Sequence, residues 1–575
     1  MTGPPLSVAL WLAAFAPVVV LFALVVSGRV RTQLAAVIAF AAALVLAVGV
    51  FQAASDVVAV GVAKGLWLGV WILYVVWPAL LLYRIASVVG IDRLGEIFTS
   101  MLSRRRENLL IVAWIFPSFI QGVAGFGTPI AVTAPLLVAM GWPRLRAVVY
   151  PLIGYHWSVT FGSMGSSFYM AALTGGFGGP AEAALALRAA LLLGVSCLVA
   201  GALVLLLDGG LGGLREGARL LLLAGLPMAA TLVLVARIVP AVASLAAGAV
   251  GLAIVALQGA ALRRRDGAAA APALQPAGTG AVDGSSQGGD DELDGGRERV
   301  EPARGNAVPR APIPPGEWAP EPEPHGQVAA ERRNPVLLLS PYLFLLATAL
   351  PVFLVPASRA WVRAHLALAL ALPATQTGYG WRNAAVVGYQ PLALLGHPGT
   401  FILLACLLGY LTYRVAGLWQ VTDARRLLGQ WARSLPAASV SILVLAALAT
   451  LLVDAGMVSV LARGAAEVAA QAYPLLAPSV GALGSFMTGS STSSNALFSA
   501  LQADVAGLLR VQPEVLVAAQ AVGANIGNSL APVVLLIGAT SVGEPDLVSR
   551  ILRTSLAPAA VLLAVATTLT FLATL

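Results

Sequence analysis

The chain has 575 residues, of which 59% are hydrophobic and only 10% are charged, and its mean hydropathy is +0.88. This composition excludes an ordinary soluble globular protein and indicates an integral membrane protein. The net charge of +8 implies no nucleic-acid partner, because arginines in cytoplasmic loops account for it, and Cys197 and Cys406, both in apolar stretches, suggest neither a disulfide framework nor a metal site.

Three apolar stretches long enough to cross the roughly 30 Å hydrocarbon core of a membrane begin near residues 6, 33 and 66. A charged stretch from Asp92 to Glu107 follows, and its three consecutive arginines place it at the cytoplasmic surface. The next segment, residues 116–135, reads FPSFIQGVAGFGTPIAVTAP. Glycine costs about 1 kcal/mol and proline about 3 kcal/mol inside a helix, so the helix should break at the GFGTP run. Because arginines flank both ends, we expect a re-entrant hairpin over residues 108–140.

Further spans are predicted over residues 147–172, 183–207, 217–237 and 239–262. The composition of residues 263–334 then changes to Gly, Pro, Ala, Asp, Glu and Arg, which predicts a disordered linker because so little of it can be buried. Spans resume over residues 336–356, 398–413 and 437–460. A second broken segment, GALGSFMTGSSTSSNALF at residues 481–498, predicts a second hairpin over residues 473–500, and two spans follow at 513–540 and 552–574.

The order of these segments repeats along the chain. Each half holds three spans, one interrupted hairpin and two spans. The predicted fold class is therefore an all-α integral membrane protein with about 12 transmembrane helices and two re-entrant hairpins in an inverted-repeat transporter architecture. The predicted units are a first repeat (1–210), two connecting spans (211–262), a cytoplasmic linker (263–334) and a second repeat (335–575). The distribution of arginines then places both termini outside.

The two broken segments carry a resemblance to a known family. IQGVAGFGTPIAVTAPLL and GSFMTGSSTSSNALFSALQ resemble the L-lactate permease family, carriers that take up lactate and glycolate with protons. The resemblance implies a proton-coupled transporter of small hydroxy-monocarboxylates in the plasma (inner) membrane, not an enzyme, with no cofactor and no metal. The family pattern has acidic residues where this chain has Gln121 and Ser491, and GNSLAP at residues 527–532 stands where the family has a lysine in GKMISP.

The candidate substrate site lies at the two hairpin tips, which we expect near the bilayer midplane and less than about 20 Å, or two helix diameters, apart. A small carboxylate can be held by helix N-terminal N–H groups and hydroxyls without a buried cation. The alternative for the serines and threonines is hydrogen bonding within their own helices or to neighbouring helices. The candidate substrate-binding residues are Gly125, Phe126, Gly127, Thr128, Ser490, Ser491, Thr492, Ser493, Ser494 and Asn495.

Proton coupling needs a titratable group at membrane depth, and His156 is the histidine that lies inside a predicted span. The alternative is a neutral core histidine bonded to a carbonyl or hydroxyl. Asp454 is expected to be an interfacial residue at the outer end of its span. The residues expected to line the path between the hairpins are Gln121, Ser158, Thr160, Ser163, Asn525 and Asn528.

Other functions remain open at this point. Hydroxyls and carbonyls in the SSTSSN run would also suit sodium, so a sodium-coupled carboxylate carrier is the main alternative. A channel is less consistent with an inverted pair of broken hairpins. An intramembrane enzyme is disfavoured because the apolar spans contain no HExxH motif and no GxSxG elbow. The expected partners are the carboxylate, the coupling ion, the lipid bilayer and a further copy in a homo-oligomer.

Overall fold

The structure is a computed structural model that describes residues 3–27, 29–90, 97, 99, 102, 104–125, 127–269, 335–419 and 421–575. Phe126 and residues 270–334 of the predicted linker lie outside the described residues. The described part of the linker is helical, because the preceding helix continues to Ala269 rather than ending near residue 262.

The described part of the first half contains helices joined by short turns and has no strand. Its helices are α1 (Val8–Val26), α2 (Thr32–Gly49), α3 (Ser55–Val89), α5 (Arg105–Leu110), α6 (Phe116–Val123), α7 (Thr128–Ala139), α8 (Arg144–Tyr155), α9 (Ser166–Thr174), α10 (Pro180–Ala236) and α11 (Ala243–Ala269). A π-helical turn, Ile111–Ile115, joins α5 to α6 without a break. α10 bends at Gly209 and Gly210, so its two arms correspond to the two spans predicted over 183–207 and 217–237.

The second half repeats this helical character and adds a small sheet. Its helices are α12 (Pro335–Leu338), α13 (Ser340–Leu354), α14 (Pro356–Ala364), α15 (Pro398–Val415), α16 (Val421–Asp454), α17 (Met457–Ala469), α18 (Ala477–Thr488), α19 (Ser491–Leu509), α20 (Pro513–Asn528), α21 (Pro532–Ser541) and α22 (Val548–Leu572). Strand β1 (Ala367–Leu372) pairs antiparallel with β4 (Val386–Ala393), and β2 (Thr375–Gln376) with β3 (Arg382–Asn383). These strands lie between the spans predicted over residues 336–356 and 398–413.

Nine helical segments of the described chain are long and apolar enough to cross a membrane, or ten if the bent pair α13 and α14 forms one span. That count takes the two arms of α10 together and leaves out α8 and α9, which are 12 and 9 residues long. Counting each arm of α10, the bent pair, and α8 with α9 as one broken span gives the predicted 12. The all-α membrane class is confirmed.

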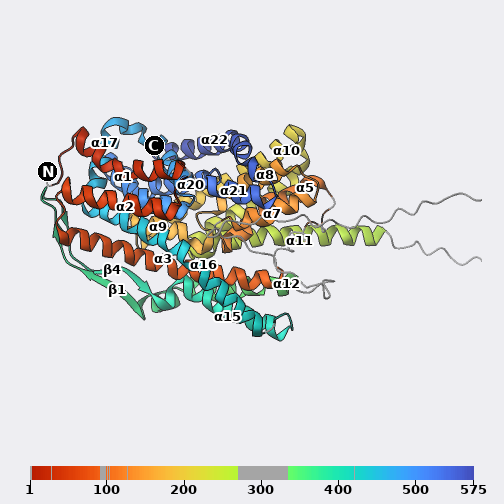
Figure 1. The fold of residues 1–575 in the computed structure, drawn as a ribbon. Coiled ribbons are helices and arrows are strands. Elements are labelled where there is room, and N and C mark those ends of the chain that lie inside the picture. The colour runs from red at the N-terminus through yellow and green to blue at the C-terminus, as the bar shows by residue number, and fades with distance from the viewer. Residues whose placement is uncertain are drawn as a thin grey trace, which may run out of the picture.

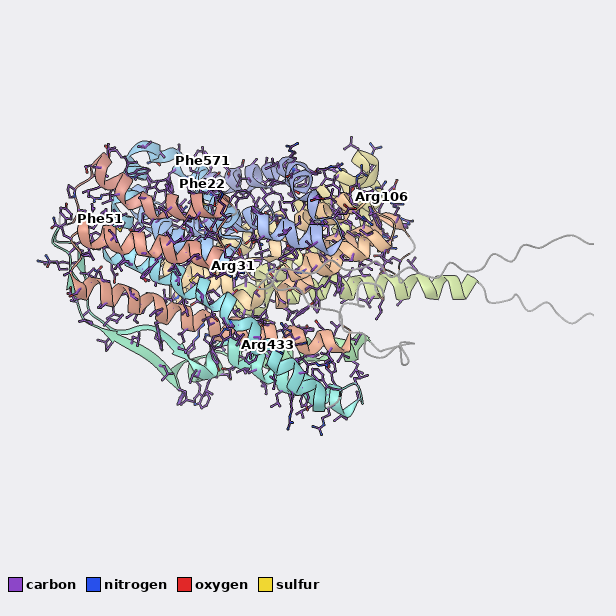
Figure 2. The ribbon with its side chains drawn as sticks, in the orientation of Figure 1. Phe22, Arg31, Phe51, Arg106, Arg433 and Phe571 are labelled. Carbon is purple, nitrogen blue, oxygen red and sulfur yellow. The ribbon has the colours of Figure 1, made fainter. Side chains whose placement is uncertain are left out.

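Two ends of the molecule can be distinguished (Figures 1 and 2). We call the end that holds Phe51 the sheet end, since β1 and β4 lie toward it, and the end that holds Arg106 the linker end, since α11 projects from it (Figures 1 and 2). Both chain termini lie toward the sheet end (Figure 1). This arrangement agrees with the expectation that both termini lie on the same side of the membrane, and which side that is stays a prediction.

Four helix breaks interrupt the bundle. The predicted breaks are present between α6 and α7, where Gly127 has φ +81°, and between α18 and α19, where Gly489 has φ +69°. The span predicted over 147–172 is instead two short helices, α8 and α9, because the chain unwinds from His156 to Gly165, with Met164 at φ +54° and Gly165 at φ +75°. The fourth break separates α20 from α21 just before Pro532.

Candidate functional site

A helix begins after each of the four breaks, and the first turns of α7, α9 and α19 are buried inside the bundle, whereas Pro532 and Val533 at the start of α21 are exposed. A helix N-terminus exposes unpaired N–H groups and the positive end of the helix dipole, both of which favour an anion. Unwound backbone at membrane depth is tolerated where it is buried in protein or lines a watery path. The breaks are therefore the places in the described bundle where a small carboxylate has backbone donors available.

Both hairpin tips contact one helix, α21. A Cβ atom at Gly127 would lie 2.5 Å from Ile537 Cδ1 and 3.5 Å from Ile537 Cβ, and one at Gly489 would lie 3.7 Å from Val533 Cβ. Ile537 and Val533 are four residues apart, so their Cβ atoms are about 6 Å apart on one face of the helix. The two tip glycines are therefore within about 16 Å of each other, which meets the expectation that the tips approach.

The first tip also packs against the break between α8 and α9. A Cβ atom at Gly125 would overlap Ser163 Oγ and would lie 3.1 Å from Gln121 Nε2. One at Gly162 would lie 2.7 Å from the same Nε2 atom. Three of the predicted site and path residues, Gln121, Gly125 and Ser163, are thus in contact, and glycine at positions 125 and 162 is what lets the backbone come this close.

The second tip is tied to the first half by Asn495. Its Nδ2 donates to the backbone oxygen of Ser167 at 2.9 Å and to Ser167 Oγ at 3.0 Å. Thr174 Oγ1 donates to the backbone oxygen of Asn495 at 3.1 Å. Asn495 therefore joins α19 to both ends of α9, because Ser167 lies in the first turn of α9 and Thr174 is its last residue. Asn495 is more than 300 positions from both residues in the sequence.

A second cross-half contact joins the two broken spans. Thr160, in the unwound stretch after α8, donates from Oγ1 to Asn525 Oδ1 of α20 at 3.0 Å. Both side chains are fully buried. Two predicted path residues from opposite halves are thus hydrogen-bonded to each other. Asn528, at the end of α20, is partly buried.

Several hydroxyls are already used within their own hairpin or helix. Ser494 Oγ donates to the backbone oxygen of Gly481 at 2.9 Å, and Ser158 Oγ donates to that of Tyr155 at 2.6 Å. Ser490 Oγ caps α19 by accepting from the backbone N–H of Ser493 at 3.3 Å. Ser491, Thr492 and Ser493 are 5–6% exposed in the first turn of α19. Ser158, Ser490 and Ser494 therefore form hydrogen bonds within their own helix or hairpin, which is the alternative to substrate binding given above.

Several polar atoms near the breaks are buried without a hydrogen-bond partner among the described residues, and they include Thr128 Oγ1, Asn495 Oδ1 and Asn525 Nδ2. Their residues are at most 1% exposed. Leaving such an atom unpaired costs roughly 1–3 kcal/mol, and native proteins do so seldom. These three atoms, an amide donor, an amide acceptor and a hydroxyl, therefore have unused hydrogen-bonding capacity.

His156 is fully buried at the start of the α8–α9 break. Its Nδ1 lies 2.8 Å from the backbone oxygen of Ile153, a distance at which Nδ1 carries the proton and donates it. Nε2 is buried without a partner and is then the unprotonated nitrogen. The ring combines the feature expected of a core histidine, a bond to a carbonyl, with a nitrogen that is able to accept a proton.

Sequence reasoning missed two buried glutamines beside the second hairpin. Gln520 Nε2 donates to Ser494 Oγ at 3.1 Å, and Gln502 Nε2 donates to Gln520 Oε1 at 3.4 Å. Both residues are fully buried. The signal was available, because each is a polar residue on an otherwise apolar helix face.

It also missed the partner of Asp454, which is Lys64. The Asp454 side chain is only 3% exposed, so it is enclosed by protein, while its position at the outer membrane interface stays a prediction. The acid lies against α3, whose lysine compensates its charge.

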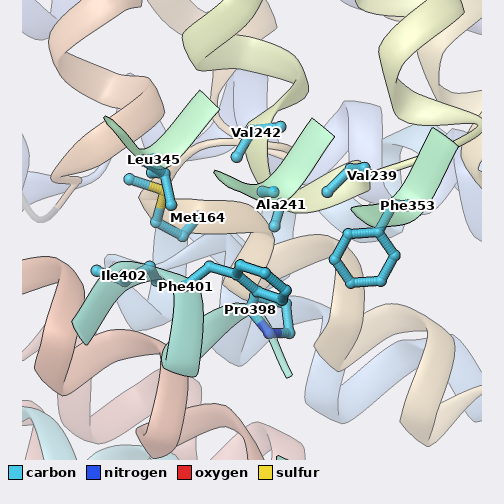
Figure 3. A pocket seen from close by; sticks show the side chains of 10 residues that line it. Met164, Val239, Ala241, Val242, Leu345, Phe353, Pro398, Phe401 and Ile402 are labelled. Atoms are coloured by element: carbon cyan, nitrogen blue, oxygen red, sulfur yellow. The ribbon is translucent and has the colours of Figure 1, made fainter. Parts of the chain in front are cut away.

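The small cavity shown in Figure 3 lies beside the α8–α9 break but is not a substrate site. Its volume is about 10 Å³, roughly the space that one water molecule requires. Its lining residues are Met164, Val239, Ala241, Val242, Leu345, Ala349, Phe353, Pro398, Phe401 and Ile402. None of these side chains offers a charged group or a hydrogen-bond donor to a carboxylate.

Comparison with known proteins gives a consistent relationship over almost the whole chain. The model of the L-lactate permease family matches residues 11–266 and 339–575. The chain is 26% identical to glycolate permease GlcA of Escherichia coli (strain K12) over 558 residues, covering 94% of this chain and 91% of that protein. It is 25% identical to L-lactate permease of Streptococcus iniae over 458 residues, covering 78% and 81%. Among solved structures, the YdaH transporter of Alcanivorax borkumensis covers 87% of this chain and 84% of its own, at 14% identity and a TM-score of 0.42.

Proposed function

Because the chain belongs to the L-lactate permease family, we propose that it is a secondary active transporter of small 2-hydroxy-monocarboxylates such as L-lactate and glycolate. It is a multi-pass membrane protein with the broken helices typical of secondary transporters. The proposal further places it in the plasma membrane, where it works by alternating access with proton coupling.

The proposal rests on the contacts that bring the helix breaks of the two halves together. Gly127 and Gly489 lie against one face of α21, and Thr160 and Asn525 join the two broken spans. The substrate carboxylate would be held by N–H groups at the starts of α7 and α19 and by Thr128 Oγ1. Asn495 Oδ1 would accept the hydrogen bond of the substrate 2-hydroxyl, because Asn495 Nδ2 is already engaged by Ser167.

The decisive measurement is uptake of labelled L-lactate and glycolate into proteoliposomes, with proton and sodium gradients imposed separately. We expect accumulation driven by an inward proton gradient and none with a sodium gradient alone. Acetate, which lacks the 2-hydroxyl, is the matched competitor and should inhibit at least ten-fold less, since it leaves Asn495 Oδ1 unpaired. No uptake of either hydroxy acid would refute the proposed substrate class.

His156 is the proposed proton carrier. Nε2 would take a proton, the resulting cation would favour carboxylate binding, and the pair would move without net charge. We expect His156→Gln to keep substrate exchange across the membrane but to lose accumulation against a gradient, because glutamine can replace the Nδ1–H bond and cannot carry a proton. Accumulation by this variant under a proton gradient would remove His156 from the coupling mechanism.

Sodium coupling is the second candidate, and Asn495 Oδ1 is the observation that favours it. A buried amide oxygen without a donor, near the hydroxyls of Ser491 and Thr492, is the kind of ligand that hard cations prefer. Uptake that follows the sodium gradient and is insensitive to pH would select this reading over proton coupling.

A further inference from the structure

α3 and α16 meet along a contact between the two halves, which we call the seam and define as Gly61–Trp77 of α3 with Trp431–Asp454 of α16. Gly61, Gly65 and Gly69 recur at every fourth position and face α16. A Cβ atom at Gly65 would overlap the backbone of Ala447, and one at Gly69 would lie 2.7 Å from Leu443 Cδ2. Small residues at this spacing let two membrane helices pack backbone to backbone.

An ion pair lies toward the sheet end of the seam. Lys64, the single lysine of the chain, places Nζ 2.9 Å from both Oδ1 and Oδ2 of Asp454. The two side chains are 11% and 3% exposed. Removing both charges from water is expensive, and a buried ion pair is weak evidence for stability by itself. Ionisable residues inside membrane helices are instead usually retained for function, with a partner of opposite charge.

The ion pair is also covered from the sheet. The ring of Tyr389 in β4 lies 5.8 Å from Lys64 Nζ, and Asn383 Nδ2 of β3 donates to the backbone oxygen of Asp454 at 2.9 Å. Burial raises the pKa of Tyr389, and the charge of Asp454 raises it further, so this ring stays neutral over the lysine. The pair is thus enclosed by α3, α16 and the sheet.

Hydrogen bonds fix the seam at both ends. Thr450 Oγ1 donates to the backbone oxygen of Gly61 at 2.7 Å beside the ion pair. Near the linker end, Trp77 Nε1 donates to Ser439 Oγ at 3.0 Å, and Trp431 Nε1 donates to the backbone oxygen of Trp77 at 2.9 Å. The bonded stretch of α3 from Gly61 to Trp77 is about 24 Å long, most of the thickness of a membrane core.

The contacts that the hairpin tips make with α21 have a different character, because they involve side chains rather than backbone. Gly489 meets α21 only through the Val533 side chain, at ordinary van der Waals distance. At the linker end, Arg144 pairs with Glu544, but these side chains are 47% and 40% exposed, and such pairs contribute little. Side-chain contacts of these two kinds can part at lower cost than the seam, which combines backbone packing, buried hydrogen bonds and a buried ion pair.

We propose that the seam stays closed throughout the transport cycle, and that Lys64 and Asp454 are positioning residues that fix the register of α3 against α16. The helices around the four breaks then move against this fixed pair. The ion pair does not take part in ion coupling, since enclosure by α3, α16 and the sheet keeps its two charges together. This inference rests on the proposed transport function.

A disulfide across the seam tests whether it opens. The Cβ atom of residue 61 would lie 3.5 Å from Asp454 Cβ, within the range that a disulfide needs. Gly61→Cys and Asp454→Cys are combined with Lys64→Met, so that no charge is left unpaired, and the native Cys197 and Cys406 are buried. We expect lactate exchange within about two-fold between the oxidised and reduced forms of this variant. Exchange that stops on oxidation and returns with reductant would overturn the proposal.

Charge variants test what the ion pair does. Lys64→Met or Asp454→Leu alone leaves one buried charge unpaired and should lower the melting temperature by about 10 °C, whereas the double variant should melt within about 3 °C of the parent. The double variant should also keep its exchange rate, KM and accumulation. A well-folded double variant that exchanges substrate but no longer accumulates it would make the pair a coupling site and refute the positioning role.

These results are separable from the proposed function. The melting comparison needs no substrate, and the oxidised and reduced rates come from one preparation. Absence of hydroxy-acid transport by the parent chain would refute the proposed substrate class, while the melting temperatures would still decide whether the pair holds the seam.

Discussion

Asn495 shows how a single side chain can serve both the fold and the site. Its amide nitrogen donates to Ser167 and so ties α19 to α9, while its amide oxygen is left buried and unpaired. Ser118 offers a contrast in the first hairpin, because its hydroxyl bonds back to Trp114 one turn earlier at 2.6 Å. A polar side chain in a membrane helix is thus a candidate for ligand binding only when one of its donors or acceptors is not already hydrogen-bonded within the protein.

Substitution of Asn495 tests whether its unpaired amide oxygen contributes to transport. Asn495→Ala removes the bonds to Ser167 and the free acceptor, so we expect transport to fall at least ten-fold, equivalent to about 1.4 kcal/mol. Ser118→Ala is the matched control and should change transport less than two-fold, since it loses one local hydroxyl bond. Initial rates of counterflow in proteoliposomes, normalised to folded protein, report both. Equal effects of the two substitutions would argue against a site at the second tip.

At the scale of helices, close backbone packing brings the second hairpin onto α20. A Cβ atom at Gly523 would overlap the backbone oxygen of Pro478 in α18, and one at Gly527 would overlap that of Ala482. The first half uses the same device, since a Cβ atom at Gly154 of α8 would overlap the backbone oxygen of Ala113. The hairpins are thereby held against the broken spans, which places their tips beside the unwound stretches.

Glycine replacements separate packing from helix propensity. Gly523→Ala should force α18 and α20 apart and lower the stability by about 1–3 kcal/mol, because backbone atoms cannot move aside as a flexible side chain does. Gly507→Ala in α19 is the control, since nothing lies within 4 Å of its Cβ position and alanine favours the helix by about 1 kcal/mol. Thermal unfolding of the purified variants should therefore shift in opposite directions. A stable Gly523→Ala variant would show that this contact is loose.

At the scale of the whole molecule, the position of the arginines indicates how the protein is oriented in the membrane. Arg106 lies at the linker end, where it pairs with Asp208 and with Glu216, and Arg144 pairs there with Glu544 of the second half. Cytoplasmic loops of membrane proteins carry an excess of arginine. The linker end is therefore expected to be cytoplasmic, and the sheet end, with both termini, is expected to face the outside (Figure 1).

Reporter fusions test this orientation. A reporter that is active only in the cytoplasm should be active when inserted at residue 284 of the linker and inactive when fused after Leu575. A reporter that is active only outside should give the reverse pattern. A cytoplasmic C-terminus would break the inverted relation between the halves and would remove the basis for hairpins that enter from opposite sides.

The sequence by itself determined the class, most spans and two of the four breaks. These depend on local properties: hydropathy decides which segments leave water, and Gly489 or the GFGTP run decides where a helix cannot continue. The break between α8 and α9 escaped detection because its serines and glycines stand in a stretch that is still apolar on average.

Only the tertiary structure decided which polar groups meet. Lys64 and Asp454 are 390 positions apart, Thr160 and Asn525 are 365 apart, and no local pattern links the members of either pair. The same packing showed that Ser494 bonds within its own hairpin, whereas Thr128 Oγ1 and Asn495 Oδ1 do not find partners. Hydropathy and backbone propensity act over a few residues, but a hydrogen bond or ion pair in a membrane bundle depends on which helices are neighbours, and that is a property of the fold as a whole.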